Sequence, residues 1–133
     1  MLEDARRETS AALDRLEAAC RAAGLTDEAV IDLRVVAEEV LTNVAKYAFE
    51  SGVAPAVELS VEVDDTEAVL EFRDRGRPFD PLAADAPDLD QPPEERPPGG
   101  LGLALVRALV DDARYERQDA ANVLRLVKRR TAQ

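Results

Sequence analysis

The pattern of apolar and polar positions begins with two helical segments. Between Leu2 and Gly24, apolar residues recur at helical spacing on one face while charged residues occupy the other, and the glycine is a natural helix end. A second helix is predicted to begin after Thr26, a favourable N-cap, and to run to about Glu50. This segment is apolar nearly all round, so we expect it to be mostly buried against a sheet.

Strand-like alternation follows the two helices. Residues Val57–Val63 alternate strictly, and Val69–Phe72 continue the alternation after the turn residues Asp64, Asp65 and Thr66. These two runs predict an antiparallel hairpin. Its second strand leads to Asp74, where a long segment rich in proline begins.

The last third of the chain predicts a short helix and a second hairpin. The helix covers Leu101–Asp111, and the strands Arg114–Gln118 and Val123–Val127 are joined by the four residues Asp119–Asn122. Helices followed by hairpins, without alternating crossovers, predict an α+β two-layer sandwich with helices on one face of a mixed or antiparallel sheet. At 133 residues the chain is expected to form a single domain over 1–133.

Composition narrows the classes of function. The formal net charge of -11, from 28 acidic and 17 basic residues, disfavours nucleic acid and anionic membrane surfaces as partners. With no histidine and only Cys20, the chain has no intramolecular disulfide, phosphohistidine or common zinc site, and Cys20 is expected to be a small buried apolar residue. No signal peptide or membrane-length apolar run is present, which makes a cytoplasmic location the default expectation.

Polar residues form one stripe on the second helix. Glu39, Asn43, Lys46 and Glu50 are spaced by four, three and four residues, so they share one helix face. Either this stripe is a solvated edge or it is a site. Asparagine is unfavourable inside a helix because it competes for backbone hydrogen bonds, so its presence favours a site.

The segment after Asp74 is either a functional lid or a surface linker. Seven of the eight prolines lie between Pro78 and Pro98, and glycines flank this interval on both sides, which favours a lid over about 77–99. Behind it, Gly100-Leu101-Gly102-Leu103 opens directly onto the third helix. The unpaired N–H groups of a helix start attract anions, and phosphate is the obvious candidate.

Three boxes in this order resemble a known family. They are Glu39-Val40-Leu41-Thr42-Asn43 followed by Lys46-Tyr47, then Asp74-Arg75-Gly76-Arg77-Pro78-Phe79-Asp80-Pro81, and then Gly99-Gly100-Leu101-Gly102-Leu103-Ala104-Leu105-Val106. The pattern resembles the Bergerat-type ATP-binding fold of gyrase-type ATPases, the Hsp90 chaperone and sensor histidine kinases. Within that group it is most similar to the anti-sigma-factor serine/threonine kinases of bacterial partner switching. Tyr47 and Pro78 depart from the residues common there, and the chain begins in a helix where relatives usually have a strand.

The resemblance implies a role for each box. Asn43 would give its side-chain oxygen to Mg²⁺, Asp74 would accept a hydrogen bond from the adenine amino group, and Gly76 would let the backbone approach the base. Lys46 would place a positive charge near the phosphates of ATP. The remaining implied nucleotide contacts are Tyr47, Pro78, Phe79, Gly99, Gly100, Leu101, Gly102 and Leu103.

Glu39 separates a kinase from a protein that only binds nucleotide. At the matching position of the serine kinases a glutamate acts as general base, so the resemblance implies phosphorylation of a small STAS-like anti-sigma-factor antagonist. Sequestration of a sigma factor and homodimerisation are implied in the same way. Two alternatives remain, a nucleotide-gated binding module without phosphotransfer and an ATP-binding fragment of a sensor kinase. Glu39 favours the kinase, because a pure binder has no use for a base.

Overall fold

The computed structural model describes residues 2–47, 56–80 and 100–130, and within them it contains helices that precede and interrupt two hairpins. The elements are α1 (Leu2–Ala22), α2 (Asp27–Tyr47), β1 (Val57–Val63), β2 (Glu67–Asp74), α3 (Gly100–Leu109), β3 (Asp112–Gln118) and β4 (Ala121–Arg129). This order matches the predicted one. None of the described helices is both long and apolar enough to cross a membrane.

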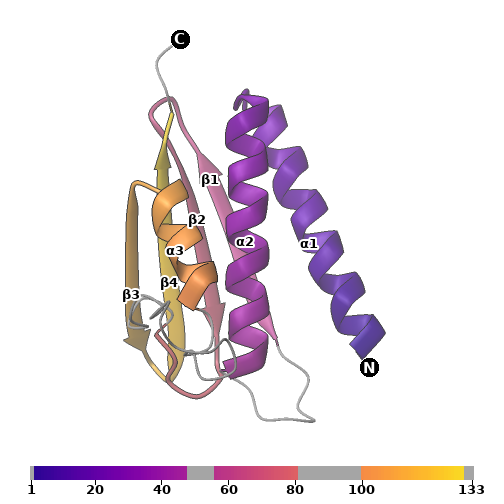
Figure 1. The fold of residues 1–133 in the computed structure, drawn as a ribbon, viewed down its shortest axis with the longest axis vertical. Helices are drawn as coiled ribbons and strands as arrows, with labels where there is room; N and C mark the ends of the chain where they lie inside the picture. The colour runs from indigo at the N-terminus through magenta and orange to yellow at the C-terminus, as the bar shows by residue number, and fades with distance from the viewer. Residues whose placement is uncertain (1, 48–55, 81–99, 131–133) are drawn as a thin grey trace.

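The described strands form one antiparallel sheet in the order β1-β2-β4-β3. Figure 1 shows α2 and α3 lying over one face of this sheet, with α1 beside α2. The α+β class and the placement of helices on one face are thus confirmed. Of the two kinds of sheet allowed by the sequence, mixed or antiparallel, the described strands form the antiparallel one.

The core lies between α2 and the two central strands. On β2 the inward residues Ala68, Leu70 and Phe72 are buried, and Phe72 lies directly across from the buried Leu124 of β4. Burial of one such large apolar side chain stabilises the fold by about 2 kcal/mol. Asp74 follows at the same two-residue period, so the strand geometry delivers an inward-facing carboxylate to the end of β2.

The junction between α1 and α2 forms as the sequence predicts. Gly24 adopts a φ of 86°, and the amides of Gly24 and Leu25 donate to the carbonyls of Arg21 and Cys20, as in a Schellman motif. Thr26 then caps α2, because its Oγ1 accepts a hydrogen bond of 3.2 Å from the amide of Ala29. The thiol of Cys20 is fully buried, and this burial raises its pKa, as expected of an inert core cysteine.

Burial of α2 is less complete than its composition suggests. Ile31 is 55% exposed, although the sequence predicts a helix buried nearly all round. Glu38 and Thr42 are exposed as well. These positions are seven and eleven residues apart on the helix and therefore share one outward strip. The apolar residues of α2 pack against α1, α3 and the sheet, and this strip faces away from that core.

The turn between β3 and β4 is shorter than predicted. Only Asp119 and Ala120 form it, with φ values of 48° and 64°, and Gln118 pairs with Ala121. Positive φ at both central residues matches the right-handed twist of the flanking strands, which is why such two-residue turns close hairpins. Asn122, predicted to lie in the turn, therefore lies in β4.

Candidate functional site

The elements that carry the predicted site residues converge at one end of the molecule. Figure 1 shows the last turn of α2, the end of β2, the start of β4 and the first turn of α3 at its lower end. These termini belong to segments far apart in sequence, from Tyr47 to Ala121. The antiparallel pairing of β2 with β4 brings Asp74 directly opposite Asn122.

Asp74 is a buried carboxylate with one oxygen in use. Asp74 is only 4% exposed. Its Oδ1 accepts hydrogen bonds from the amide of Gly76 and from Nδ2 of Asn122, both at 2.9 Å. Among the described residues no group donates to Oδ2. Among the described residues, every fully buried side-chain nitrogen or oxygen has a hydrogen-bond partner. Because Oδ2 has none, it is not fully buried and is reached by solvent. It is a negatively charged acceptor available to a ligand.

Asn122 connects Asp74 to the turn that follows β2. Its Nδ2 also donates to the carbonyl of Arg77 at 2.8 Å, and its Oδ1 accepts from the amide of Phe79 at 3.2 Å. The same Oδ1 accepts from the Tyr115 hydroxyl and, at 3.1 Å, from Nη1 of Arg117. We call these six residues, Asp74, Arg77, Phe79, Tyr115, Arg117 and Asn122, the Asn122 network.

The Asn122 network also reaches Gly76. Nη1 of Arg117 donates to the Gly76 carbonyl at 2.9 Å, so both backbone polar groups of this glycine are engaged by the network, the N–H by Asp74 and the carbonyl by Arg117. Gly76 is buried, and its predicted contact with the base stays a prediction. Of the residues predicted next to it, Pro78 is exposed and Phe79 is half-buried against the core.

Sequence reasoning missed Asn122, although a signal was present. Asn122, Leu124 and Leu126 alternate at the two-residue period of a strand, and both leucines are buried. Extending that alternation backwards would have placed the carboxamide on the inward face. Because a four-residue turn was predicted, the strand was expected to start at Val123, whereas β4 starts two residues earlier, at Ala121.

The polar stripe on α2 is described for its first two members. Glu39 and Asn43 are both half-buried, whereas the neighbouring Glu38 is exposed. Neither side chain forms a hydrogen bond within the described residues, which leaves both free to bind a ligand. For Lys46 and Tyr47 only the helical backbone is described, and their roles stay predictions.

The glycine-rich box begins α3 as predicted. Gly100, Leu101, Gly102 and Leu103 form the first turn, which contains no acidic residue that would repel an anion. The roles of these four residues in phosphate binding stay predictions. Gly99 and most of the predicted lid lie outside the described residues.

A cavity of about 600 Å³ lies at the opposite end of the sheet. It is bordered by the start of α2, the β1–β2 turn and the end of β4, and it contains none of the predicted site residues. Across it, Nζ of Lys128 pairs with Asp32 at 3.5 Å and donates to the carbonyl of Leu109 at 2.8 Å. These contacts join α2, α3 and β4.

Comparison with known proteins identifies the family of the chain. The model of the histidine kinase-like ATPase domain matches residues 2–128. The chain belongs to this family. The match includes α2, Asp74, α3 and Asn122, and therefore all the elements that meet at the site.

Curated relatives of this histidine kinase-like ATPase domain are named protein kinases. Serine/threonine-protein kinase BtrW of Bordetella bronchiseptica is 34% identical over 94 residues, which cover 71% of this chain and 66% of BtrW. Serine-protein kinase RsbW of Listeria monocytogenes is 33% identical over 111 residues, covering 77% and 68% of the two chains. RsbW of Oceanobacillus iheyensis is 26% identical over 99 residues, covering 71% and 63%. The chain thus matches about two-thirds of the length of these relatives.

Proposed function

We propose that this domain binds Mg-ATP at the Asp74 end and transfers its γ-phosphoryl group to a serine or threonine of a partner protein. The observation that carries the proposal is the state of Asp74, a buried carboxylate with Oδ1 held by two donors and Oδ2 left open. The names of the curated relatives support the same reaction.

The adenine amino group is a hydrogen-bond donor and would bind Oδ2 of Asp74. A hydrogen bond to an ionised acceptor in a buried site contributes about 1.5–3 kcal/mol. Guanine presents a carbonyl at the corresponding position, so the same oxygen would repel it. Asp74 therefore selects the base.

The phosphates would lie over the start of α3. Unpaired N–H groups of Gly100 to Leu103 and the positive end of the helix favour negative charge there. The side-chain oxygen of Asn43 is suited to coordinate Mg²⁺, because this ion prefers oxygen donors. Mg²⁺ takes few ligands from the protein when phosphates and water complete its coordination shell. The bound ion would neutralise charge on the phosphates, and Lys46 would add a second positive charge.

Glu39 would act as the general base. It lies four residues before Asn43, which corresponds to a rise of about 6 Å along the helix. The substrate hydroxyl would bond to the γ-phosphorus as the bond from this phosphorus to the bridging oxygen breaks, releasing ADP, and the Glu39 carboxylate would take the hydroxyl proton.

The protein substrate in this proposal is a small STAS-like anti-sigma-factor antagonist. The proposal includes sequestration of a sigma factor, a homodimer as the working state, and action in the cytoplasm, where ATP is available. These features rest on the resemblance alone, whereas the names of the curated relatives support only the protein kinase reaction.

The test uses purified protein, γ-labelled ATP with Mg²⁺, and a lysate of the source cells as the source of substrate. Glu39→Gln should lower the labelling of a small protein about 100-fold or more while the Kd for Mg-ATP changes less than about twofold. Glu38→Gln, which alters the exposed neighbouring carboxylate, is the matched control and should label like wild type.

Two results would contradict the proposal. Equal labelling by Glu39→Gln and wild type would remove Glu39 as the base. If wild type binds Mg-ATP but labels no protein, the domain is a nucleotide-gated binding module.

A further inference from the structure

We propose that Asn122 is the positioning residue of the nucleotide pocket, aligning Asp74 with the base and tying the turn after β2 to the β3–β4 hairpin. This inference rests on the proposed function. Asn122 is 4% exposed, and both N–H groups of its carboxamide are directed at Asp74 and the turn beside it, while its oxygen accepts from that turn and from Tyr115 and Arg117 of β3. We expect it to contribute to nucleotide binding without contacting the reacting phosphate.

The first half of the inference concerns the orientation of Asp74. The terminal torsion of an aspartate is broad and roughly twofold, so its two oxygens exchange easily when nothing distinguishes them. Two donors converge on Oδ1, the Gly76 amide from the adjacent turn and Nδ2 of Asn122 from the neighbouring strand. They hold the carboxylate plane from two directions, so Oδ2 is presented in one orientation before the nucleotide arrives.

The second half concerns the turn after β2. Nδ2 of Asn122 donates to the Arg77 carbonyl and its Oδ1 accepts from the Phe79 amide, across sequence separations of 45 and 43 residues. The same side chain that aligns the base acceptor therefore fixes the backbone of this turn from Arg77 to Phe79.

The chemistry of this position requires a carboxamide. One N–H must reach Asp74, a second must reach the Arg77 carbonyl, and an oxygen must accept from the Phe79 amide. Serine and threonine have one donor, and ionised aspartate has none and would repel Asp74. Asparagine supplies two donors and an acceptor on a short side chain.

The experiment measures base preference, which a loss of stability alone would not change. We would compare the Kd of Mg-ATP with that of Mg-purine ribonucleoside triphosphate, which lacks the 6-amino group. Wild type should prefer ATP by about tenfold or more, the value of one hydrogen bond to a charged acceptor. Asn122→Ala should reduce this preference to about threefold or less, mainly by weakening ATP binding.

The control and a second variant keep the test decisive. Gln118→Ala removes an exposed carboxamide on the same hairpin and should retain the wild-type preference. If Asn122→Ala does not fold, as judged by circular dichroism, Arg117→Ala serves instead. It removes the bonds to Asn122 and Gly76 from an exposed side chain, and should lower the preference in the same direction by a smaller factor.

The outcomes separate this inference from the proposed function. An unchanged preference in the folded variant, Asn122→Ala or its replacement Arg117→Ala, overturns the positioning role while Asp74 remains the base acceptor. If wild type itself does not bind ATP or shows no preference for it, the proposed function fails.

Discussion

The two ends of the sheet both contain clusters of polar groups, but they use them differently. At the Asp74 end, the carboxylate and the carboxamide of Asn122 are almost completely buried, and a solvent-accessible oxygen remains without a partner in the described chain. At the other end, Nη1 and Nη2 of Arg130 donate to the carbonyls of Asp64 and Gly24 on the exposed surface. The first cluster presents an acceptor to a ligand, while the second ties loops together.

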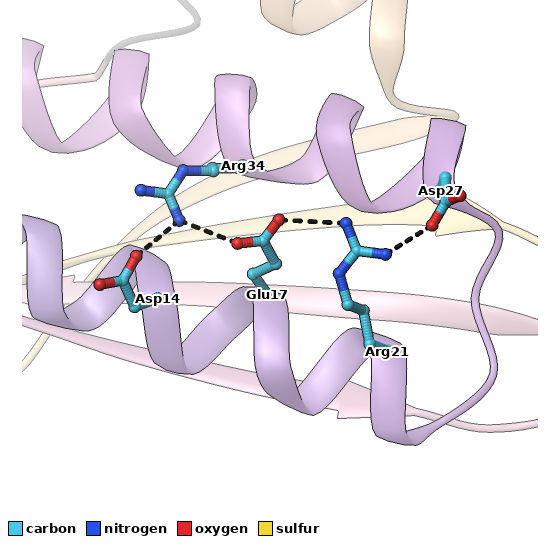
Figure 2. Close-up of polar contacts among 5 residues, drawn as sticks. All are labelled: Asp14, Glu17, Arg21, Asp27 and Arg34. Carbon is cyan, nitrogen blue, oxygen red and sulfur yellow. Dashed lines mark hydrogen bonds and ion pairs between the residues drawn. The ribbon is translucent and has the colours of Figure 1, made fainter.

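A larger charged cluster joins α1 to α2 on the side of the molecule shown in Figure 2. Arg34 pairs with Asp14 at 3.0 Å and with Glu17 at 3.4 Å, while Arg21 links Glu17 to Asp27. These side chains are between 31% and 84% exposed. Solvent screens such exposed pairs. The four ion pairs here are therefore weaker evidence for a binding site than the two hydrogen bonds on buried Asp74. Burial, more than the number of charges, distinguishes the site.

The largest effect expected from this comparison is on ATP affinity. Asp74→Asn keeps an oxygen that can accept from Gly76 and Asn122, but it replaces the open acceptor with an N–H donor facing the adenine amino group. We expect the Kd for Mg-ATP to rise about 10–150-fold, with little change in the free energy of unfolding. Isothermal titration calorimetry measures the first quantity and urea denaturation the second.

The same change at the other end of the sheet is the matched control. Asp32→Asn removes the carboxylate that pairs with Lys128, next to the cavity. It should leave the Kd for Mg-ATP within about twofold, because Asp32 lies at the opposite end of the molecule from Asp74. A twofold change corresponds to a much smaller free energy than the loss of one hydrogen bond to a charged group. A strong loss of ATP binding in Asp32→Asn, or undiminished binding in Asp74→Asn, would mean that the pocket is misplaced.

A smaller effect is expected from breaking the α1–α2 cluster. Arg34→Ala removes two ion pairs, but the side chain is 31% exposed and its partners are partly hydrated. We expect a loss of about 1 kcal/mol or less in the free energy of unfolding, and a smaller loss at 1 M salt. Urea denaturation at low and high salt measures this loss. Arg15→Ala, which changes an exposed arginine of α1 outside the cluster, is the control. A salt-independent loss above about 3 kcal/mol would place this pair among buried ion pairs.

What the sequence could predict was local. The end of α1 at Gly24 and the cap of α2 at Thr26 depend on neighbouring residues, and the structure confirms both. The shared helix face of Glu39 and Asn43 follows from their spacing of four residues. The role of Glu39 as a base comes from the family resemblance and stays a prediction. The first hairpin was also predictable, because its turn residues and its alternation lie within one short segment.

What the sequence did not predict depends on tertiary structure or on an ambiguous turn. Neither Asp119 nor Ala120 is a glycine, the residue that usually marks the positive φ values of a two-residue turn. Asn122 was therefore assigned to the loop. The exposure of Ile31 depends on which sides of α2 the other helices cover. The roles of Lys46 and Gly99 in phosphate binding stay predictions.

The smallest expected effect is a pH dependence at the β1–β2 turn, far from Asp74. Hydrogen bonds from the amides of Thr66 and Glu67, and from the Thr66 hydroxyl, lower the pKa of Asp64 below its ordinary value. A carboxylate whose pKa is lower in the folded state adds stability above its unfolded pKa and loses it as the pH falls through the folded value. Asp64 is fully exposed, so the contribution is small.

Asp64→Asn isolates this contribution, because the carboxamide oxygen can still accept from the turn but does not titrate. The free energy of unfolding of wild type should exceed that of the variant at about pH 7, and the difference should shrink as the pH falls through and below the ordinary pKa range of aspartate, where the carboxylate becomes protonated. Urea denaturation of both proteins across this range measures the difference, in which the other carboxylates largely cancel. A difference that is constant with pH, or that grows in acid, would show that the turn does not depend on the charge of Asp64. ATP affinity should be the same in both proteins at neutral pH, since this turn lies at the opposite end of β2 from Asp74.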